Sequence, residues 1–401
     1  MNTSLFSNLR TRCPSRRTLL NWGMGVVLTA TLGMATAGGK SYSYFITGNV
    51  QGTTLASPAT PSIVLMGGGP DVDEAFRWMI TRAGIKPGTG GRFVVIRATG
   101  TEAYDPYIYY SDAALTTSAT VADQWVGGAS LGLTSVETLV IPSIKAANDP
   151  EVNSVVSKAD AVFIAGGDQS DYIKYWKGTK LEQTLQGLMT RNVPMGGTSA
   201  GLAVLGQFDF AALRGSVTSS EALGNPYNKY MTLDPAPLSL TGGFLAPPAL
   251  ANTILDSHVD SRDRMGRLIT FVARLVAPQV TPSGTTGCAG GILTTGTVSS
   301  SIARGIGVSV ETALLVQGNG ATKPYTARRV TNPSTTTESA VYFVRPLNSP
   351  TTCASGQALT MTTVEIRKLI DSNTTFNLSD WSGLPSYSVD AISGSLTSSP
   401  Y

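Results

Sequence analysis

A serine in a glycine-rich turn and a single histidine are the residues of this sequence best suited to covalent chemistry. Ser199 lies in "GTSAG" (197–201), which fits the pattern G-x-S-x-G. This pattern predicts a sharp strand-to-helix turn that lifts a nucleophilic hydroxyl clear of a sheet. Backbone amides at the start of the helix would also favour a developing negative charge. His258 is the only histidine in the chain, so it is the only imidazole that could activate Ser199 as a base.

A serine–histidine pair usually includes a carboxylate that orients the imidazole and stabilises its cation. Glu221, in "SVTSSEAL" (216–223), lies between Ser199 and His258 in the chain and is our first choice. Asp256 is an alternative, although it is only two residues from His258. A structural role, as a hydrogen-bonded imidazole, is the competing interpretation of His258 itself.

Two more stretches carry groups that could bind a substrate. "AGGDQ" (165–169) follows an apolar run, and its glycines would let a backbone N–H point at a carbonyl oxygen; a simple tight turn is the alternative. "DSHVDSRDRMGR" (256–267) surrounds the histidine with arginines. Arginine binds carboxylates through two parallel hydrogen bonds, which suits a charged peptide. A solvated helix start with local ion pairs is the other interpretation.

Several motifs of cofactor and metal sites are absent. "GGGP" (67–70) lacks the spacing of a dinucleotide site, and "GGKS" (38–41) lacks the first glycine of a phosphate loop, because Met34 stands there. Neither CxxC nor HExxH occurs, and one histidine with two distant cysteines makes a poor zinc site. We therefore expect no metal and no organic cofactor.

The first 37 residues are typical of an export signal. They hold four arginines, no acid, "SRRTLLN" (15–21) and the apolar run "WGMGVVLTATLGM", and end in Ala35–Ala37. We expect cleavage and a periplasmic or secreted protein without membrane association; a membrane anchor is the alternative. The rest of the chain is nearly neutral and has no basic stripe, which argues against nucleic-acid binding. In an oxidising compartment Cys288 and Cys353 would form a disulfide.

The pattern of elements predicts an α/β fold with a mostly parallel sheet covered by helices on both faces. Apolar, strand-like runs alternate with helical periodicity. The predicted strands are 62–69, 92–100, 138–143 and 161–168, and the predicted helices are 71–84, 149–159 and 180–192. Residues 38–60 indicate a linker or a loose first strand. Residues 61–401 would form one catalytic domain with extra β-structure from about 270, as in 305–316 and 339–346. Surface loops are expected at 279–301 and 330–357.

Taken together, these stretches resemble the cyanophycinases and related serine peptidases of the peptidase E type, which share a fold with class I glutamine amidotransferases. The resemblance spans about residues 62–320. It rests on "FIAGGDQ", "PMGGTSAGLAVL", the segment with Glu221, "GIGVSVETALLV" and the pattern D-S-H-x-x-x-R-D-R-M-G-R-L. The chain departs from the pattern at Ser257, where cyanophycinases carry Gln.

The resemblance implies a role for each matching residue. Ser199 would be the nucleophile, His258 the base and Glu221 the orienting acid. The N–H groups of Ala200 and of Gly167 or Asp168 would form the oxyanion hole. The substrate-binding set would be Gln169, Asp256, Arg262, Arg264 and Arg267.

By the same resemblance the chain would be an exported serine exopeptidase and a homodimer. It would hydrolyse cyanophycin, a polyaspartate that carries arginine on its side chains, to β-Asp-Arg dipeptides. A peptidase for other aspartyl or isoaspartyl peptides, an α/β-hydrolase esterase and a non-catalytic binding protein of the same fold are the alternatives. The long chain after His258 argues against the esterase.

Overall fold

A computed structural model describes residues 40–52, 55–110, 127–235, 243–279, 287–293, 302–319 and 325–401. Residues 41–401 form one compact unit. The predicted export signal (1–37) lies outside the described residues. Within the described part, no helix has both the length and the apolar character needed to cross a membrane.

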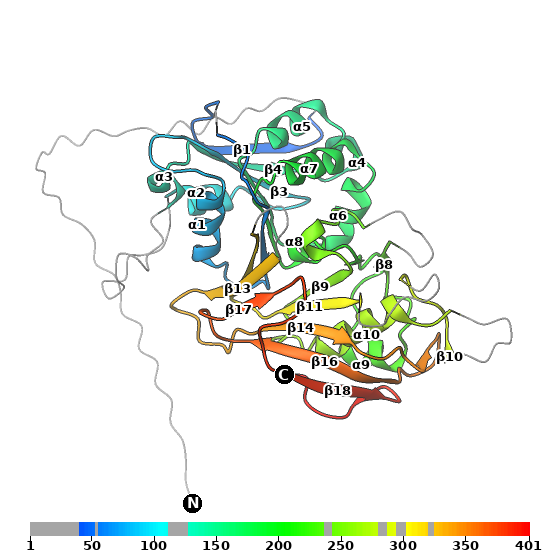
Figure 1. Ribbon diagram of the computed structural model, residues 1–401. Helices are drawn as coiled ribbons and strands as arrows, with labels where there is room; N and C mark the ends of the chain where they lie inside the picture. The colour runs from blue at the N-terminus through cyan, green and yellow to red at the C-terminus, as the bar shows by residue number, and fades with distance from the viewer. Residues whose placement is uncertain are drawn as a thin grey trace, which may run out of the picture. The chain divides into compact units, whose positions relative to one another are not determined.

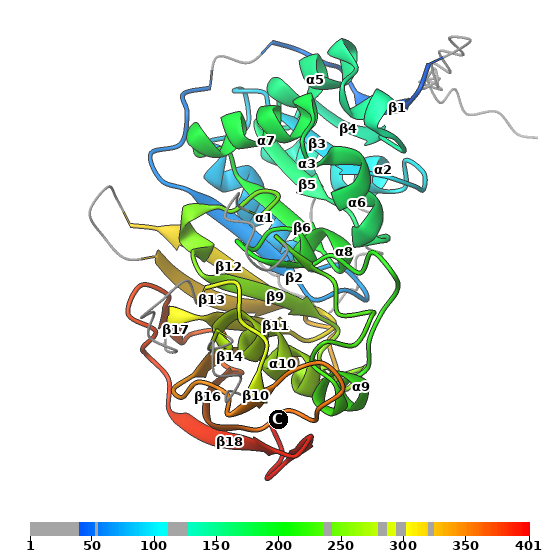
Figure 2. The same cartoon turned by 90° about the vertical axis from the view of Figure 1, so that its right-hand side faces the viewer.

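Five parallel strands form the centre of a nine-stranded sheet, in the order β4-β3-β5-β6-β2 (Figure 2). Figure 1 shows the same sheet between its two layers of helices. Their bounds are β2 Ser62–Met66, β3 Arg92–Arg97, β4 Ser135–Val140, β5 Ala161–Ile164 and β6 Met195–Thr198. Nearly every side chain on these strands is buried, because both faces are covered. The predicted α/β class with a largely parallel sheet is confirmed.

Helices cover the two faces of this sheet and create two separate cores (Figure 2). One face carries α4 Ile144–Ala147, α5 Pro150–Ser157, α6 Gln169–Trp176 and α7 Lys180–Thr190; the other carries α1 Asp73–Arg82, α2 Tyr104–Tyr110 and α3 Gly128–Leu131. The predicted start of α5 is confirmed: the Asp149 carboxylate accepts a hydrogen bond of 2.8 Å from the N–H of Glu151, and Pro150 is the first helical residue.

Antiparallel strands extend the central sheet at both edges. On one side β1 (Ser43–Gly48) pairs with β4, so part of the stretch 38–60 is a strand rather than a linker. On the other side β12 (Thr312–Gly318) pairs with β2, followed by β13 (Tyr325–Thr331) and β17 (Thr375–Asn377). The added C-terminal β-structure therefore lies partly at the edge of the main sheet.

A second, six-stranded sheet has its own core with α9 and α10. It contains β9 Thr253–Ser257, β11 Arg304–Val308, β14 Val341–Pro346, β16 Met361–Leu369, β18 Ser386–Ile392 and β19 Ser395–Leu396, with α9 Ser219–Gly224 and α10 Met265–Val276. The β-structure predicted for 305–316 is confirmed, and it divides between the two sheets as β11 and β12, with Glu311 at a positive φ of 55° between them.

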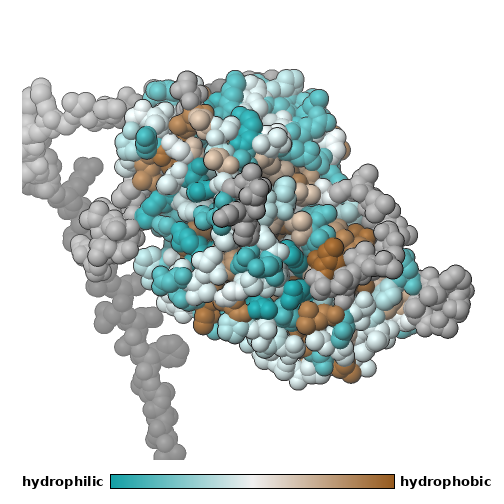
Figure 3. All heavy atoms as spheres, viewed as in Figure 1, coloured by the Kyte–Doolittle hydropathy of each residue, from teal (hydrophilic) through white to brown (hydrophobic). Residues whose placement is uncertain are grey.

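Short elements complete the described fold: α8 Ala200–Ala203, β7 Asp209–Phe210, β8 Leu233–Asp234, a 3₁₀ turn at Pro248–Leu250, β10 Gly287–Cys288 and β15 Thr352–Cys353. On the face seen in Figure 3, apolar residues form separate small patches among polar ones. Such scattered patches are ordinary for a protein surface.

Candidate active site

Ser199 occupies a strained turn between β6 and α8. Its φ of 53° and ψ of −111° fall outside the regions that L-residues prefer. The backbone N–H of Ser199 donates to the carbonyl oxygen of Met66 at 3.1 Å, which fixes the turn against β2. The sharp strand-to-helix turn predicted from G-x-S-x-G is confirmed.

The two glycines of the motif allow this turn to pack closely on β5. A Cβ at Gly201 would lie 2.0 Å from the carbonyl oxygen of Ile164. A Cβ at Gly197 would lie 2.5 Å from the backbone of Gly201. Side chains at either position would push the turn outwards, so both glycines serve the position of Ser199.

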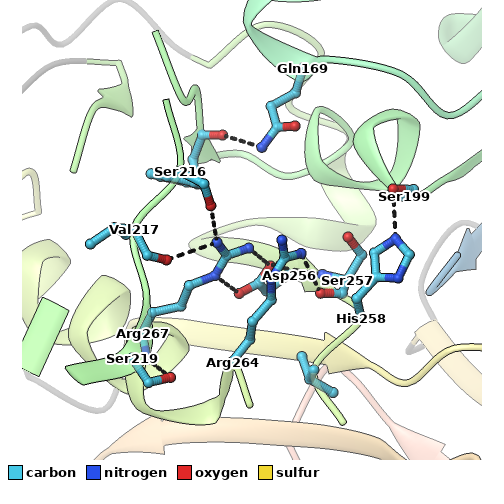
Figure 4. Close-up of polar contacts among 12 residues, drawn as sticks. Gln169, Ser199, Ser216, Val217, Ser219, Asp256, Ser257, His258, Arg264 and Arg267 are labelled. Carbon is cyan, nitrogen blue, oxygen red and sulfur yellow. Dashed lines mark hydrogen bonds and ion pairs between the residues drawn. The ribbon is translucent and has the colours of Figure 1, made fainter. Parts of the chain in front are cut away.

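His258 reaches Ser199 from the second sheet, directly after β9. Its Nε2 lies 2.9 Å from Ser199 Oγ, in hydrogen-bond contact (Figure 4). The backbone N–H of His258 donates to the carbonyl oxygen of Gly67 at 2.9 Å, at the end of β2. The predicted contact between the serine and the only histidine is therefore present, and it joins the two sheets.

The glycine run after β2 forms a wall against the imidazole. A Cβ at Gly68 would lie 2.3 Å from His258 Nε2, and φ at Gly68 is 94°. The pattern "GGGP" (67–70) was tested only against the spacing of a dinucleotide site, and this role beside the histidine was not predicted. Consecutive glycines at the carboxyl end of a parallel strand were the available signal, because sites form at that edge.

The imidazole is poised as a neutral base. The pKa of His258 is lowered to about 4, mainly by burial and also by the nearby cations Arg262 and Arg264. The carboxylates of Asp256 and Asp260 act in the opposite direction but more weakly. At neutral pH the ring is uncharged, so Nε2 can accept the proton of Ser199 Oγ.

Glu221 does not take the predicted place beside the imidazole. Its carboxylate is exposed and accepts hydrogen bonds of 2.9 Å from both the N–H and the Oγ1 of Thr218. Together with the bond from the N–H of Glu221 to Thr218 Oγ1, this is a capping box at the start of α9. Among the described residues, the only side-chain hydrogen bond of His258 is the one to Ser199.

Asp256 lines the cavity beside Ser199, and its carboxylate is held from behind by Arg267. Arg267 Nε donates to Asp256 Oδ2 at 2.7 Å and Nη2 to Oδ1 at 2.5 Å, while Nη1 donates to Ser216 Oγ and the Val217 carbonyl oxygen (Figure 4). Both side chains are buried. Of the predicted substrate-binding set, Arg267 is therefore a support behind the site, and it occupies the carboxylate of Asp256.

A cavity of about 400 Å³ opens beside Ser199. Four of the five predicted binding residues line it: Gln169, Asp256, Arg262 and Arg264. Arg264 Nη1 donates to the carbonyl oxygen of Ser257 at 2.9 Å, and burial lowers the pKa of Arg264 to about 10, so it is still a cation at neutral pH. Arg262 is exposed, and in the described part of the chain its side chain has no hydrogen bond or ion pair.

The predicted oxyanion donors border the same cavity. Gly167, Asp168 and Ala200 all line it. A Cβ at Gly166 would lie 3.6 Å from Ser199 Cβ, so the loop after β5 runs beside the nucleophile. The N–H of Ala200 opens α8, where it has no acceptor within the helix. Asp168 caps α6, since its carboxylate accepts from the N–H of Ser170 at 2.8 Å.

Cys288 and Cys353 are buried free thiols rather than the predicted disulfide. They are directly paired in the register between β10 and β15, and Cys288 Sγ donates to the Pro350 carbonyl oxygen at 3.2 Å. Both were predicted in surface loops, but 4% and 0% of their surfaces are exposed. In the described ranges, no three His, Cys, Asp or Glu side chains are grouped to hold a metal ion.

Part of this chain is similar in sequence to known proteins. Residues 126–219 match the model of peptidase family S51, a range that includes Ser199 and the loop 165–169. The cyanophycinases of Trichormus variabilis and Nostoc sp. are each 30% identical over 144 residues, which are 36% of this chain and 43% of theirs. The matched segment thus spans less than half the length of these relatives.

Two solved structures are also similar. A peptidase from an acI-B1 Actinobacterium has 14% identity and a TM-score of 0.40, over 75% of this chain and 96% of its own. A putative peptidase E protein from Listeria monocytogenes EGD-e has 14% identity and a TM-score of 0.33, over 68% and 100%. The similarity to peptidase family S51 thus covers residues 126–219, and the similarity to the cyanophycinases covers 36% of the chain.

Proposed function

We propose that this chain is an exported serine peptidase that forms an acyl-enzyme on Ser199, with His258 as the base. The observation that carries the proposal is the 2.9 Å contact between Ser199 Oγ and His258 Nε2 at the wall of a cavity lined by arginines. A strained nucleophile, a neutral imidazole and nearby amide donors together support acyl transfer.

In the acylation step, His258 Nε2 takes the proton of Ser199 Oγ as the oxygen attacks the scissile carbonyl carbon. The N–H of Ala200, with that of Gly167 or Asp168, stabilises the negative oxygen of the tetrahedral intermediate. The imidazolium then protonates the leaving nitrogen as the C–N bond breaks. A water molecule, deprotonated by His258, hydrolyses the ester and restores the Ser199 hydroxyl. The imidazole works here without the carboxylate contact predicted for Glu221.

The charges around the cavity favour a substrate with carboxylates. Arg262 and Arg264 line the cavity, whereas the carboxylate of Asp256 is occupied by Arg267. Guanidinium groups bind carboxylates in two-point geometry. Asp168 lines another part of the cavity and offers a negative group for an arginine side chain. Together with the curated cyanophycinases, this supports cyanophycin as substrate and β-Asp-Arg as product.

A second candidate substrate class is isoaspartyl dipeptides. Ser257 lies in the cavity wall where cyanophycinases carry Gln, and the shorter hydroxyl leaves different space and hydrogen bonding. A changed wall at this position affects the substrate rather than the chemistry at Ser199.

Purified chain incubated with cyanophycin or with β-Asp-Leu, beside Ser199→Ala, tests both proposals. We expect Ser199→Ala to release no dipeptide, and Ser220→Ala, at an exposed serine in α9, to behave like the wild type. Equal release by wild type and Ser199→Ala contradicts the mechanism. Cleavage of β-Asp-Leu alone keeps the mechanism and removes cyanophycin. Expression with the native N-terminus, followed by sequencing of the exported product, tests cleavage near residue 37.

A further inference from the structure

The turn between β9 and α10 carries the two arginines of the cavity wall. Its backbone closes through hydrogen bonds from Arg264 N–H to the Val259 carbonyl oxygen at 2.8 Å and from Arg262 N–H to the His258 carbonyl oxygen at 3.2 Å. Asp263 has a φ of 45°, a left-handed conformation that costs free energy for a residue with a side chain. The shape of this turn therefore depends on contacts from outside it.

Tyr401 supplies such contacts from a distant part of the sequence. Its Oη lies 3.0 Å from the Val259 carbonyl oxygen and 2.7 Å from Asp263 Oδ1, and it accepts from the N–H of Met265 at 3.4 Å. One hydroxyl group thus touches the start, the strained position and the end of the same turn. Both arginines of the turn line the cavity, and Arg264 is also held by the Ser257 carbonyl oxygen at 2.9 Å.

The ring of Tyr401 is itself held in place. It packs edge-on against Tyr342 of the second sheet, with ring centroids 5.7 Å apart. The neighbouring carbonyl oxygen of Pro400 accepts a hydrogen bond of 2.8 Å from Tyr387 Oη on β18. The hydroxyl therefore acts from a fixed point, which is what a positioning residue requires.

We propose that Tyr401 is a positioning residue for substrate recognition: its hydroxyl fixes the turn 259–265 so that Arg262 and Arg264 meet a substrate carboxylate. The proposal rests on the proposed function. His258 has separate supports, in the Gly67 carbonyl oxygen and the wall at Gly68. Loss of the Tyr401 hydroxyl should therefore weaken binding of the substrate and leave proton transfer at Ser199 nearly unchanged.

Tyr401→Phe keeps the ring and removes only the hydroxyl. With cyanophycin or β-Asp-Leu, whichever is cleaved, we expect KM to rise about threefold to tenfold, the range for a typical lost hydrogen bond, with kcat changed less than twofold. Tyr227→Phe is the matched control, because its Oη also donates to a backbone carbonyl, that of Gly290 at 2.7 Å, but in another part of the second core. The control should keep the wild-type KM.

Hydrogen exchange of the free protein provides a readout that does not need activity. In Tyr401→Phe, the amides of Arg262, Arg264 and Met265 should exchange faster, while those of β14 keep their protection. Unchanged exchange in this turn overturns the positioning role even if the chain is inactive. Faster exchange with an inactive wild type keeps the role of the hydroxyl and refutes the proposed function instead. A fall in kcat at constant KM makes Tyr401 a general structural residue and also overturns the proposal.

Discussion

Arg267 and Asp256 form a buried two-point ion pair, with 2.7 Å between Nε and Oδ2 and 2.5 Å between Nη2 and Oδ1. The pair joins α10 to the end of β9, two residues before His258. Arg267 also stacks over Phe210 and Phe271, at 5.1 and 5.7 Å from the ring centroids. The position of the imidazole thus depends on a cation that is itself buried.

Removing one partner of this pair should destabilise the fold. Arg267→Ala leaves the buried Asp256 carboxylate with only the more distant Arg264, whose Nη1 lies 3.8 Å from Oδ1. We therefore expect the free energy of unfolding to fall by about 3 kcal/mol, the lower end for a broken buried pair. Urea denaturation followed by circular dichroism measures the change. Lys368→Ala removes a 2.5 Å pair with Glu338, which is exposed, and should cost less than about 1 kcal/mol. Similar losses in the two variants would contradict a structural role specific to Arg267.

Activity should fall only in strongly acidic solution. The pKa of His258 is lowered to about 4, so the neutral base is present above that pH, and kcat/KM should decline as pH falls through about 4. The free energy of unfolding should also fall as the pH falls, because His258 in the unfolded chain binds a proton below about pH 6.5. Its contribution to stability is therefore complete above that value and is lost as pH falls towards 4.

The pH profile has an internal control. Arg262→Ala removes a cation that lowers the His258 pKa, so its acidic limb should move to higher pH. Lys174→Ala removes a different cavity cation, one that is not among the groups acting on the pKa of His258. The decline of kcat/KM in acid should therefore occur at the same pH in this variant as in the wild type. A wild-type limb centred near 6.5, the ordinary value for histidine, would show that burial does not act as described.

The two cysteines should join when the protein is oxidised. Directly paired residues of neighbouring strands lie within the Cα separation that a disulfide needs, and Cys288 is opposite Cys353. With excess oxidised glutathione in mild denaturant, two thiols lose two protons and two electrons to the glutathione disulfide. Intact-mass measurement should then show the loss of two hydrogen atoms. Alkylation of both cysteines after this treatment would contradict the pairing, and Cys288→Ser serves as the control.

The sequence allowed the central sheet and the Ser199–His258 contact to be predicted, because each rests on local or obligatory features. The apolar strands and the G-x-S-x-G turn are determined by neighbours in the chain, and a single histidine leaves one choice of base. Glu221 could not be placed in this way. Its capping box with Thr218 is a local alternative to a catalytic contact, and sequence order alone does not distinguish the two.

The place of His258 in the second sheet could not be predicted for a related reason. β9 and β11 pair in parallel although they are distant in the chain, and only their packing with α10 shows that His258 belongs to a different sheet from Ser199. The support by Arg267 and by Tyr401 depends on the same long-range packing. A cluster of arginines near a histidine does not reveal which of them face a cavity and which are buried.

Gly201, two residues after the nucleophile Ser199, gives the most direct test of the close packing of the turn. In Gly201→Ala the new Cβ would lie 2.0 Å from the Ile164 carbonyl oxygen, which is backbone and cannot rotate away. We expect the free energy of unfolding to fall by at least about 3 kcal/mol, the upper end for overpacking, and any folded protein to lose activity as Ser199 is displaced. Gly187→Ala, in α7, meets open space and should stabilise the chain by about 0.5–1 kcal/mol. Thermal unfolding and dipeptide release measure both variants side by side. A Gly201→Ala protein with wild-type stability and activity would show that the turn does not need the close approach to β5.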